Sequence, residues 1–228
     1  KKAQELGYAE RNPEADVEGY DACRKVAILS SLMTGKNVDA EKIYTEGITG
    51  ISPADFDYAK AAGMTIKLLA VSEALEDGKV LAMVAPAFVS MEHPLAAVND
   101  VYNGVFIRGN MLGDVMFYGR GAGKLPTASA VVSDVIDCAR HIGRSSIICL
   151  WDQEEAGLAD VGESRKRFFV RAKVSARGKA EEIFPGCCFV ECGRTEDCGF
   201  LTAEMSEKEF REKSGALGDG LLSRIRLA

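Results

Sequence analysis

Apolar residues recur at intervals of three and four in three parts of the chain, which is the spacing of an amphipathic helix. The first helix is predicted to end near Gly35, and its apolar stripe consists of Ala22, Val26, Leu29 and Met33. The second is predicted to begin at Ser52 with Asp55 completing a capping-box pattern, and to end at Gly63. The third follows a glycine-rich turn, and its stripe consists of Ala128, Val131, Val135, Ala139 and Ile142.

Runs of apolar and β-branched residues predict four strands in the same part of the chain. They are expected at residues 64–71, 79–89, 101–108 and 112–118. Glu76-Asp77-Gly78 is a strong hairpin turn between the first two, and Gly109-Asn110 lies between the others. We therefore expect an α/β fold of the α+β type, with a mixed, largely antiparallel sheet and helices on one face.

A composition change at residues 151–164, which are acidic and contain glycines, predicts a linker. The elements expected after it, in the order β-α-β-β-α-β, are 167–174, 179–184, 187–192, 200–205, 207–217 and a strand from Leu221. This order is that of a ferredoxin-like module. In metabolic enzymes such a module looks like an ACT domain, which senses amino acids or dimerises. The expected parts are therefore residues 1–150, the linker 151–164 and an ACT-like module at 165–228.

The composition excludes several classes of protein. The chain has 228 residues, of which 47% are hydrophobic and 27% charged, and these values are typical of a globular protein. A formal net charge of −6 argues against general nucleic-acid binding, which needs clustered basic residues. Because the chain begins with Lys1 and shows no signal-like segment, we expect it to be a piece of a longer protein.

The seven cysteines are an odd number in a long chain, which favours reduced thiols and a cytoplasmic location over a disulfide framework. Four of them are close enough in sequence to raise the question of zinc: Cys187, Cys188, Cys192 and Cys198. Their spacing fits zinc sites poorly, and His93 and His141 are far away in sequence. We interpret these cysteines as small buried residues and assign no metal.

The first candidate site lies at residues 7–25, with the sequence GYAERNPEADVEGYDACRK. Asp21 and Lys25 are four residues apart on the first predicted helix, so their side chains can meet on one face. An ordinary surface ion pair is the simpler interpretation of that spacing alone. Together with Glu10 and Asp16, however, they place three carboxylates and an ammonium near one helix start, which would suit recognition of an amino acid's ammonium group.

The second candidate site lies at residues 119–130, with the sequence GRGAGKLPTASA, between a strand and a helix. Glycines allow the backbone to approach a ligand closely, and the N-terminus of a helix favours anionic groups. The stretch matches neither a Walker A loop nor the full dinucleotide fingerprint. A tight turn before a helix remains the alternative.

Taken together, the two motifs resemble those of homoserine dehydrogenase, over about residues 7–144. The segment between them also resembles the family at Glu46-Gly47-Ile48, at residues 66–70 and at Pro94-Leu95-Ala96. The resemblance implies the interconversion of L-aspartate 4-semialdehyde and L-homoserine with NADP or NAD, on the route to threonine and methionine.

The resemblance also implies roles for the residues of the first motif. Lys25 is similar to the family's proton donor and acceptor, and Asp21 to the residue that orients the substrate or the lysine. Glu10 is similar to the carboxylate that binds the substrate's amino group, and Gly7 belongs to the same loop. Asp16 is placed with them on the substrate side.

In the second motif, Gly119, Gly121, Ala122 and Gly123 match the family's loop near the nicotinamide end of the cofactor. The family's Rossmann domain, with its G-x-G-x-x-G turn, should precede Lys1. We therefore expect this chain to fold and to form a homodimer through its sheet, but to be inactive alone. The choice between NAD and NADP would lie in the preceding half.

The ACT-like module departs from ligand-binding ACT domains. Residues 175–178 replace their acidic Pro-Gly loop, and Phe184-Pro185-Gly186 ends the first helix early. Threonine binding and a purely structural or dimerising role both remain open for the module. The alternative for the whole chain is a non-catalytic amino-acid-sensing protein on the same scaffold, which the sequence upstream of Lys1 would distinguish from an enzyme.

Overall fold

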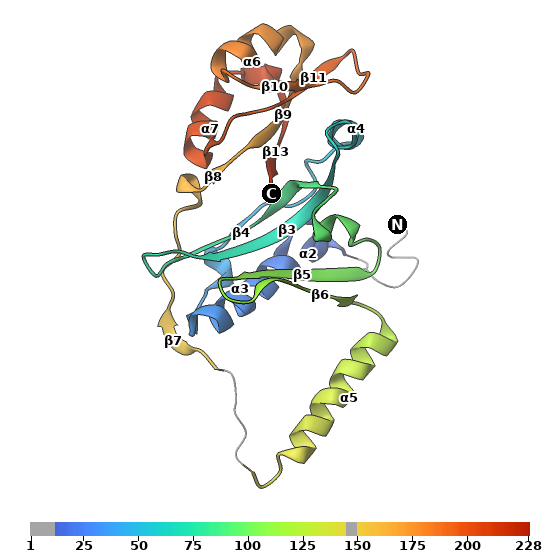
Figure 1. The fold of residues 1–228 in the computed structure, drawn as a ribbon, viewed down its shortest axis with the longest axis vertical. Coiled ribbons are helices and arrows are strands. Elements are labelled where there is room, and N and C mark those ends of the chain that lie inside the picture. The colour runs from blue at the N-terminus through green and yellow to red at the C-terminus, as the bar shows by residue number, and fades with distance from the viewer. Residues whose placement is uncertain (1–11, 145–149) are drawn as a thin grey trace. The chain divides into compact units, whose positions relative to one another are not determined.

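The structure is a computed structural model that describes residues 12–144 and 150–228. Figure 1 shows the chain as a ribbon. Its residues form two compact units. The larger unit consists of Glu14–Met91 and Trp151–Ala228, and the smaller includes the described residues between Glu92 and Leu150. Within the described ranges, no helix combines the length and the apolar character needed to cross a membrane.

The larger unit is built on one mixed sheet. Its first segment contains α2 (Glu14–Val17), α3 (Tyr20–Thr34), β1 (Lys36–Asn37), β2 (Tyr44–Thr45), α4 (Pro53–Ala61), β3 (Met64–Ala74) and β4 (Val80–Ser90). Its second segment contains β7 (Asp152–Glu155), β8 (Arg165–Lys166), β9 (Phe168–Lys173), α6 (Arg177–Ile183), β10 (Cys188–Val190), β11 (Asp197–Leu201), β12 (Met205–Ser206), α7 (Glu207–Gly215) and β13 (Leu221–Leu227).

Strand β4 links the two segments of the larger unit. The order along the sheet is β10-β11-β9-β13-β4-β2, and β3 pairs antiparallel with β4 over its whole length. The C-terminal strand β13 pairs parallel with β4, with Arg226 opposite Ala87 and Leu227 opposite Phe88. The mixed, largely antiparallel sheet predicted from the sequence is confirmed, and it extends into the C-terminal segment.

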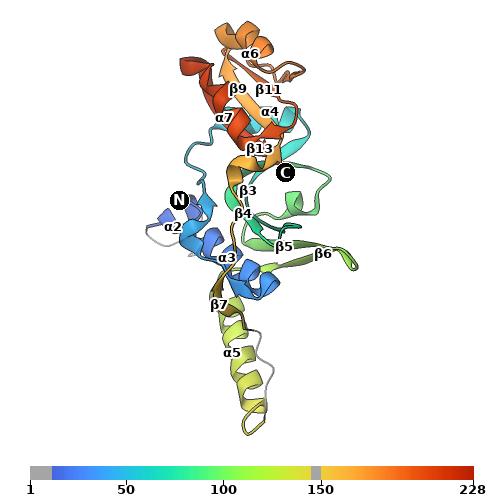
Figure 2. The same ribbon diagram turned by 90° about the vertical axis from the view of Figure 1, so that its left-hand side faces the viewer.

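The C-terminal segment has the element order expected of it, β9-α6-β10-β11-α7-β13. Its four main strands lie side by side in the order β10-β11-β9-β13, and each neighbouring pair is antiparallel. Numbered along the chain, this is the order 2-3-1-4. This is a ferredoxin-like arrangement, and Figure 2 shows α6 and α7 together with β9 and β11. Helix α6 ends at Ile183, before the Phe184-Pro185-Gly186 sequence that was predicted to end it.

Residues 151–164, predicted as a linker, carry regular structure and contacts. Strand β7 pairs parallel with β1, and the Ala156 amide donates to the Asn37 carbonyl at 2.8 Å. A 3-10 turn follows at Val161–Glu163, and Val161 packs against residues of β4. The division into residues 1–150, 151–164 and 165–228 stays a prediction, whereas the contacts place Glu14–Met91 and Trp151–Ala228 in one unit.

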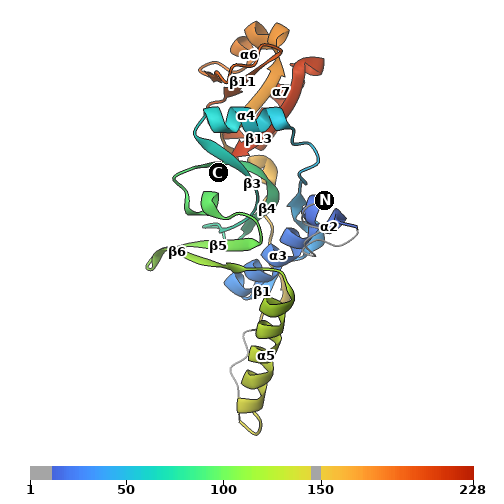
Figure 3. The same cartoon turned by 90° about the vertical axis from the view of Figure 1, so that its right-hand side faces the viewer.

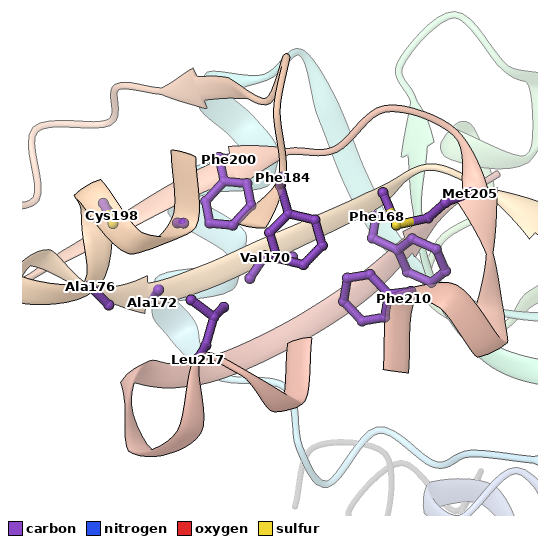
Figure 4. Packing of buried hydrophobic residues seen from close by; sticks show 11 residues of the cluster. Phe168, Val170, Ala172, Ala176, Phe184, Cys198, Phe200, Met205, Phe210 and Leu217 are labelled. Atoms are coloured by element: carbon purple, nitrogen blue, oxygen red, sulfur yellow. The ribbon is translucent and has the colours of Figure 1, made fainter. Parts of the chain in front are cut away.

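Aromatic side chains fill the core of the C-terminal segment. Phe168 stacks on Phe210 with ring centroids 3.9 Å apart, and Phe184 and Phe200 pack beside them. Figure 4 shows these rings between the strands and the helices, with Met205 at one side. Complete burial of each ring removes a large apolar surface from water, which is the main stabilising contribution here.

A buried ion-pair network joins α4 to the C-terminal strands. Arg171 of β9 is only 12% exposed, and it donates to Asp55 at 2.9 Å and to Asp197 at 3.0 Å. Tyr58 of α4 also donates to Asp197, at 2.9 Å, and Figure 3 shows α4 beside β11. Burial alone would raise the pKa of Asp55, but hydrogen bonds from Ser223, Ser52 and Arg171 hold it below its ordinary value of 3.8.

The smaller unit consists of a hairpin and a long helix. Strands β5 (Tyr102–Gly109) and β6 (Gly113–Arg120) pair antiparallel, a 3-10 turn precedes them at Pro94–Ala97, and α5 (Lys124–Arg140) follows. The hairpin and the helix predicted for this region are therefore confirmed. None of the residues of α5 is buried, although the helix carries the predicted apolar stripe.

Replacement of Asp55 by alanine tests the network. The change leaves Arg171 buried with one carboxylate fewer and removes the acceptor that Ser52 uses at the start of α4. We expect Asp55→Ala to lower the free energy of unfolding by about 3–5 kcal/mol, measured by urea denaturation. The matched control is Asp57→Ala on the same helix, where the carboxylate is 57% exposed and 3.4 Å from Arg194. We expect this control to change stability by less than about 0.5 kcal/mol; equal losses in both variants would contradict the assignment.

Candidate active site

Helix α3 carries the first candidate site. It begins after Gly19, and the Cys23 amide donates to the Gly19 carbonyl at 2.9 Å. The buried face of the helix packs against the sheet through Cys23, Val26, Ala27, Ser30 and Ser31. This face fixes the rotation of the helix and therefore the direction of its other side chains.

The buried face differs from the stripe predicted from the sequence. Leu29 and Met33 are 46% and 50% exposed, whereas Ser30 and Ser31 are buried. The serines are compatible with burial because their hydroxyls are hydrogen-bonded: Ser30 donates to Val26 at 2.6 Å, and Ser31 donates to Ala27 at 2.8 Å. Small residues let the helix approach the sheet closely, so the larger apolar residues lie on the other side.

Asp21 and Lys25 form the ion pair that their spacing predicted. The Lys25 ammonium lies 2.7 Å from the Asp21 carboxylate, and the two side chains are 60% and 47% exposed respectively. An exposed pair of this kind contributes little to stability. Its exposure does leave the ammonium accessible to a small molecule, with a fixed acceptor beside it.

Asp16 lies on α2, one short turn before α3, and it is exposed. The segment between Asp16 and Asp21 is held by the Ile48 amide, which donates to the Val17 carbonyl at 2.8 Å. The structure thus brings Asp16, Asp21 and Lys25 onto consecutive elements of the larger unit. The other two predicted substrate-side residues, Gly7 and Glu10, lie outside the described residues.

The glycine turn of the second motif belongs to the smaller unit. Gly119 is in β6, opposite Asn103, and the Gly121 amide donates to the Val101 carbonyl at 3.3 Å. A Cβ atom on Gly121 would lie 1.9 Å from the Asn103 amide nitrogen, so any other residue would require the Asn103 side chain to move. The turn is therefore folded tightly against the end of the hairpin.

The start of α5 provides a polar, electropositive backbone. The helix begins after Gly123, whose φ is 115°, with no side-chain cap and no acidic residue in the first turn. Ala122 and Gly123 are half-buried, while Arg120 and Lys124 are exposed beside them. Backbone N–H groups at the start of a helix, with basic neighbours, favour anionic groups.

Within residues 12–144 and 150–228, the structure shows no group of three His, Cys, Asp or Glu side chains that could hold a metal ion. Burial raises the pKa of the Cys198 thiol above its ordinary value.

Two features of the larger unit were not assigned from the sequence. The loop Glu46-Gly47-Ile48 contacts the segment between Asp16 and Asp21, yet the sequence marked it only as part of the family resemblance. Lys67 lies in the middle of β3, and burial lowers its pKa. Because Leu68 packs with the α3 core, strand alternation places Lys67 on the opposite face of the sheet from Lys25.

Comparison with known proteins identifies relatives for most of the chain. A homoserine dehydrogenase family model matches residues 1–136. The chain is 55% identical to a homoserine dehydrogenase of Synechocystis sp. over 138 residues, which is 59% of this chain and 32% of that protein. It is 36% identical to the Bacillus subtilis homoserine dehydrogenase over 191 residues, or 81% of this chain and 44% of that protein. The chain thus spans less than half the length of these relatives.

Solved structures agree with the sequence relatives. The whole chain superimposes on 57% of a homoserine dehydrogenase from Thiobacillus denitrificans, with a TM-score of 0.86 and 28% identity. It also superimposes on 58% of the homoserine dehydrogenase of S. aureus, with a TM-score of 0.77 and 29% identity. The family match covers more than half of the chain and includes both motifs, which confirms the resemblance: this chain belongs to the homoserine dehydrogenase family.

Proposed function

We propose that this chain is the substrate-side part of a homoserine dehydrogenase, which interconverts L-aspartate 4-semialdehyde and L-homoserine in threonine and methionine biosynthesis. The ion pair of Lys25 and Asp21 on α3, at 2.7 Å, is the observation that carries the proposal. The same residues form the motif through which the chain resembles its relatives.

Lys25 is proposed as the proton donor and acceptor. Reduction of the aldehyde places negative charge on its oxygen, and an adjacent ammonium stabilises that charge and supplies the proton that completes the alcohol. In the reverse direction, a neutral Lys25 takes the proton from the hydroxyl. Asp21 orients the ammonium through the ion pair and contacts the substrate.

The remaining substrate contacts are proposed for the loop before α3. Asp16 is exposed and next to the segment that leads into α3, where its carboxylate can bind the substrate's ammonium group. Glu10 and Gly7 are proposed to act with it. Three carboxylates close together would bind the ammonium group of the amino-acid substrate, and the aldehyde at its other end would then be free to reach Lys25.

NADP or NAD is the proposed cofactor, and its nicotinamide supplies or accepts the hydride. Gly119, Gly121, Ala122 and Gly123 are proposed to approach it through the backbone, with the start of α5 facing its polar groups. The rest of the cofactor site is proposed to lie in a nucleotide-binding part that this chain does not include.

A second copy of this chain is the proposed partner, bound through the sheet. Val105, Ile107 and Phe117 share one face of the β5–β6 hairpin by register and are 39%, 46% and 63% exposed. A two-stranded sheet with an exposed apolar face has little stability by itself. Pairing with a second copy would cover this face.

A cytoplasmic location is proposed because the described cysteines are free thiols. The cysteines of the described ranges are all free: Cys23, Cys138, Cys187, Cys188, Cys192 and Cys198. Free thiols are typical of proteins in reducing compartments.

The catalytic proposal is tested in a chimera in which this chain replaces the matching part of the Synechocystis relative. We expect the chimera to oxidise NADPH with aspartate semialdehyde, and the 228-residue chain alone to show no activity. Lys25→Ala in the chimera should lower kcat by at least about 100-fold, because the general acid is lost, and leave the KM for NADPH unchanged.

Lys36→Ala is the matched control for this experiment. Lys36 forms an ion pair with Glu154 at the same distance, 2.7 Å, and its side chain is 45% exposed, but it lies in β1, after the C-terminal end of α3. An active Lys25→Ala chimera would overturn the assignment of Lys25. An inactive parent chimera would favour the amino-acid-sensing alternative.

The homodimer is tested by sedimentation equilibrium of the chain. We expect twice the monomer mass of 24.5 kDa. Phe117→Asp should shift the chain to a monomer, because a charge on the apolar face is costly to bury. Asp114→Ala, on the other face of the same strand, should leave the dimer intact; dissociation of both variants, or of neither, would argue against this interface.

Threonine is proposed as an effector of the C-terminal module. A cavity of about 230 Å³ there is lined by residues that include Arg177, Phe189 and Arg194, and the Arg177 guanidinium lies 4.1 Å from the Phe189 ring centroid. We expect isothermal titration to detect threonine binding to the chain and Arg177→Ala to abolish it. Absence of heat at millimolar threonine would assign the module a structural or dimerising role instead.

A further inference from the structure

Glu46 lies where the C-terminal strand meets the loop that follows β2. Its carboxylate accepts hydrogen bonds from Arg226 at 2.8 Å and from the Tyr44 hydroxyl at 2.9 Å. Its backbone amide donates to the Val84 carbonyl of β4 at 2.8 Å. Burial alone would raise the pKa of Glu46, but the adjacent Arg226 lowers it below its ordinary value, so the carboxylate is ionised at neutral pH.

Arg226 is anchored independently of Glu46. It is 5% exposed in β13, and its guanidinium also pairs with Glu207, the fully buried first residue of α7. The guanidinium carbon lies 5.3 Å from the centroid of the Tyr44 ring. Arg226 is therefore a fixed cation of the C-terminal segment. It donates to the Tyr44 hydroxyl of β2 at 3.3 Å and to Glu46 of the loop at 2.8 Å.

Gly47 and Ile48, which follow Glu46, contact the segment just before α3. A Cβ atom on Gly47 would lie 2.6 Å from both the Glu18 Cα and the Val17 carbonyl oxygen, so the two backbones are in direct contact. The Ile48 amide donates to the Val17 carbonyl at 2.8 Å. Val17 and Glu18 stand directly between Asp16 on α2 and the first turn of α3, which carries Asp21.

We propose that Glu46 is a positioning residue, which fixes Asp16 and Asp21 for the substrate by tying the loop 46–48 to Arg226 of the C-terminal segment. The proposal rests on the proposed function of Asp16, Asp21 and Lys25. The Arg226–Glu46 pair would give the C-terminal segment a direct effect on the substrate side of the enzyme, in addition to the pairing of β13 with β4. Loss of the carboxylate would loosen the segment from Val17 to Gly19 while Arg226 keeps its pair with Glu207.

Hydrogen exchange of the 228-residue chain tests the structural step without any activity. In Glu46→Ala, we expect the amides of Ile48 and Cys23, which donate to Val17 and Gly19, to exchange about tenfold faster because this part opens locally. Amides of β9 should keep their rates. The control is Glu209→Ala, which removes an ion pair of the same length, 2.8 Å, from α7 without touching the loop.

Kinetics of the active chimera test the consequence for the substrate. Glu46→Ala should raise the KM for homoserine about tenfold, with kcat and the KM for NADP changed by less than about threefold. Glu46→Gln should restore most of the affinity, since its amide oxygen can accept from Arg226 and Tyr44. If Glu46→Ala does not fold, Tyr44→Phe removes one of the two donors and should change the same amides and the same KM by about threefold.

The outcomes separate this proposal from the proposed function. Unchanged exchange at Ile48 and Cys23, equal acceleration in β9, or the same result in Glu209→Ala would overturn the positioning role. An inactive parent chimera would overturn the proposed function and leave the exchange result valid. Faster local exchange with an unchanged KM for homoserine would show that the loop is tied to Arg226 but does not position the substrate carboxylates, and would also overturn the proposal.

Discussion

Strand β13 lies between β9 and β4, antiparallel to one and parallel to the other, and this placement joins the end of the chain to the strand that supports α3. Strand pairing satisfies backbone groups that would otherwise be buried without partners. It also carries Arg226 from the C-terminal segment to the loop after β2. The C-terminal segment is thus part of the sheet under the candidate active site.

Charged residues reinforce this junction at two places. Arg171 holds Asp55 and Asp197 on the α4 side, and Arg226 holds Glu46 and Glu207 on the α3 side. Buried ion pairs of this kind contribute less to net stability than to the choice of one arrangement, because an alternative arrangement would leave a charge unpaired. The two arginines therefore specify how the C-terminal strands meet the rest of the larger unit.

The candidate site follows from the same arrangement. Small and hydroxylated residues of α3 face the sheet, so the Asp21–Lys25 pair lies on the accessible part of the helix. The glycine turn before α5 is shaped independently within the smaller unit by Gly121 and Asn103. The conformation of each motif is therefore determined within its own unit. The proposed reaction involves residues of both motifs.

The sequence by itself determined the local features of this protein. Turn residues such as Gly78, the start of α4 at Ser52, the spacing of Asp21 and Lys25 and the order of the C-terminal elements all depend on neighbours within a few residues. The two sequence motifs were also sufficient to identify the protein family.

Tertiary structure decided which faces and which strands meet. The sequence placed Leu29 and Met33 on the buried side of α3, because apolar spacing does not show that hydrogen-bonded serines can replace them. It gave no sign that β13 would pair with β4, or that Arg171 would bind Asp55, 116 residues away. Such contacts depend on the shapes and charges of surfaces formed only after the local elements have folded, so no pattern within a single segment records them.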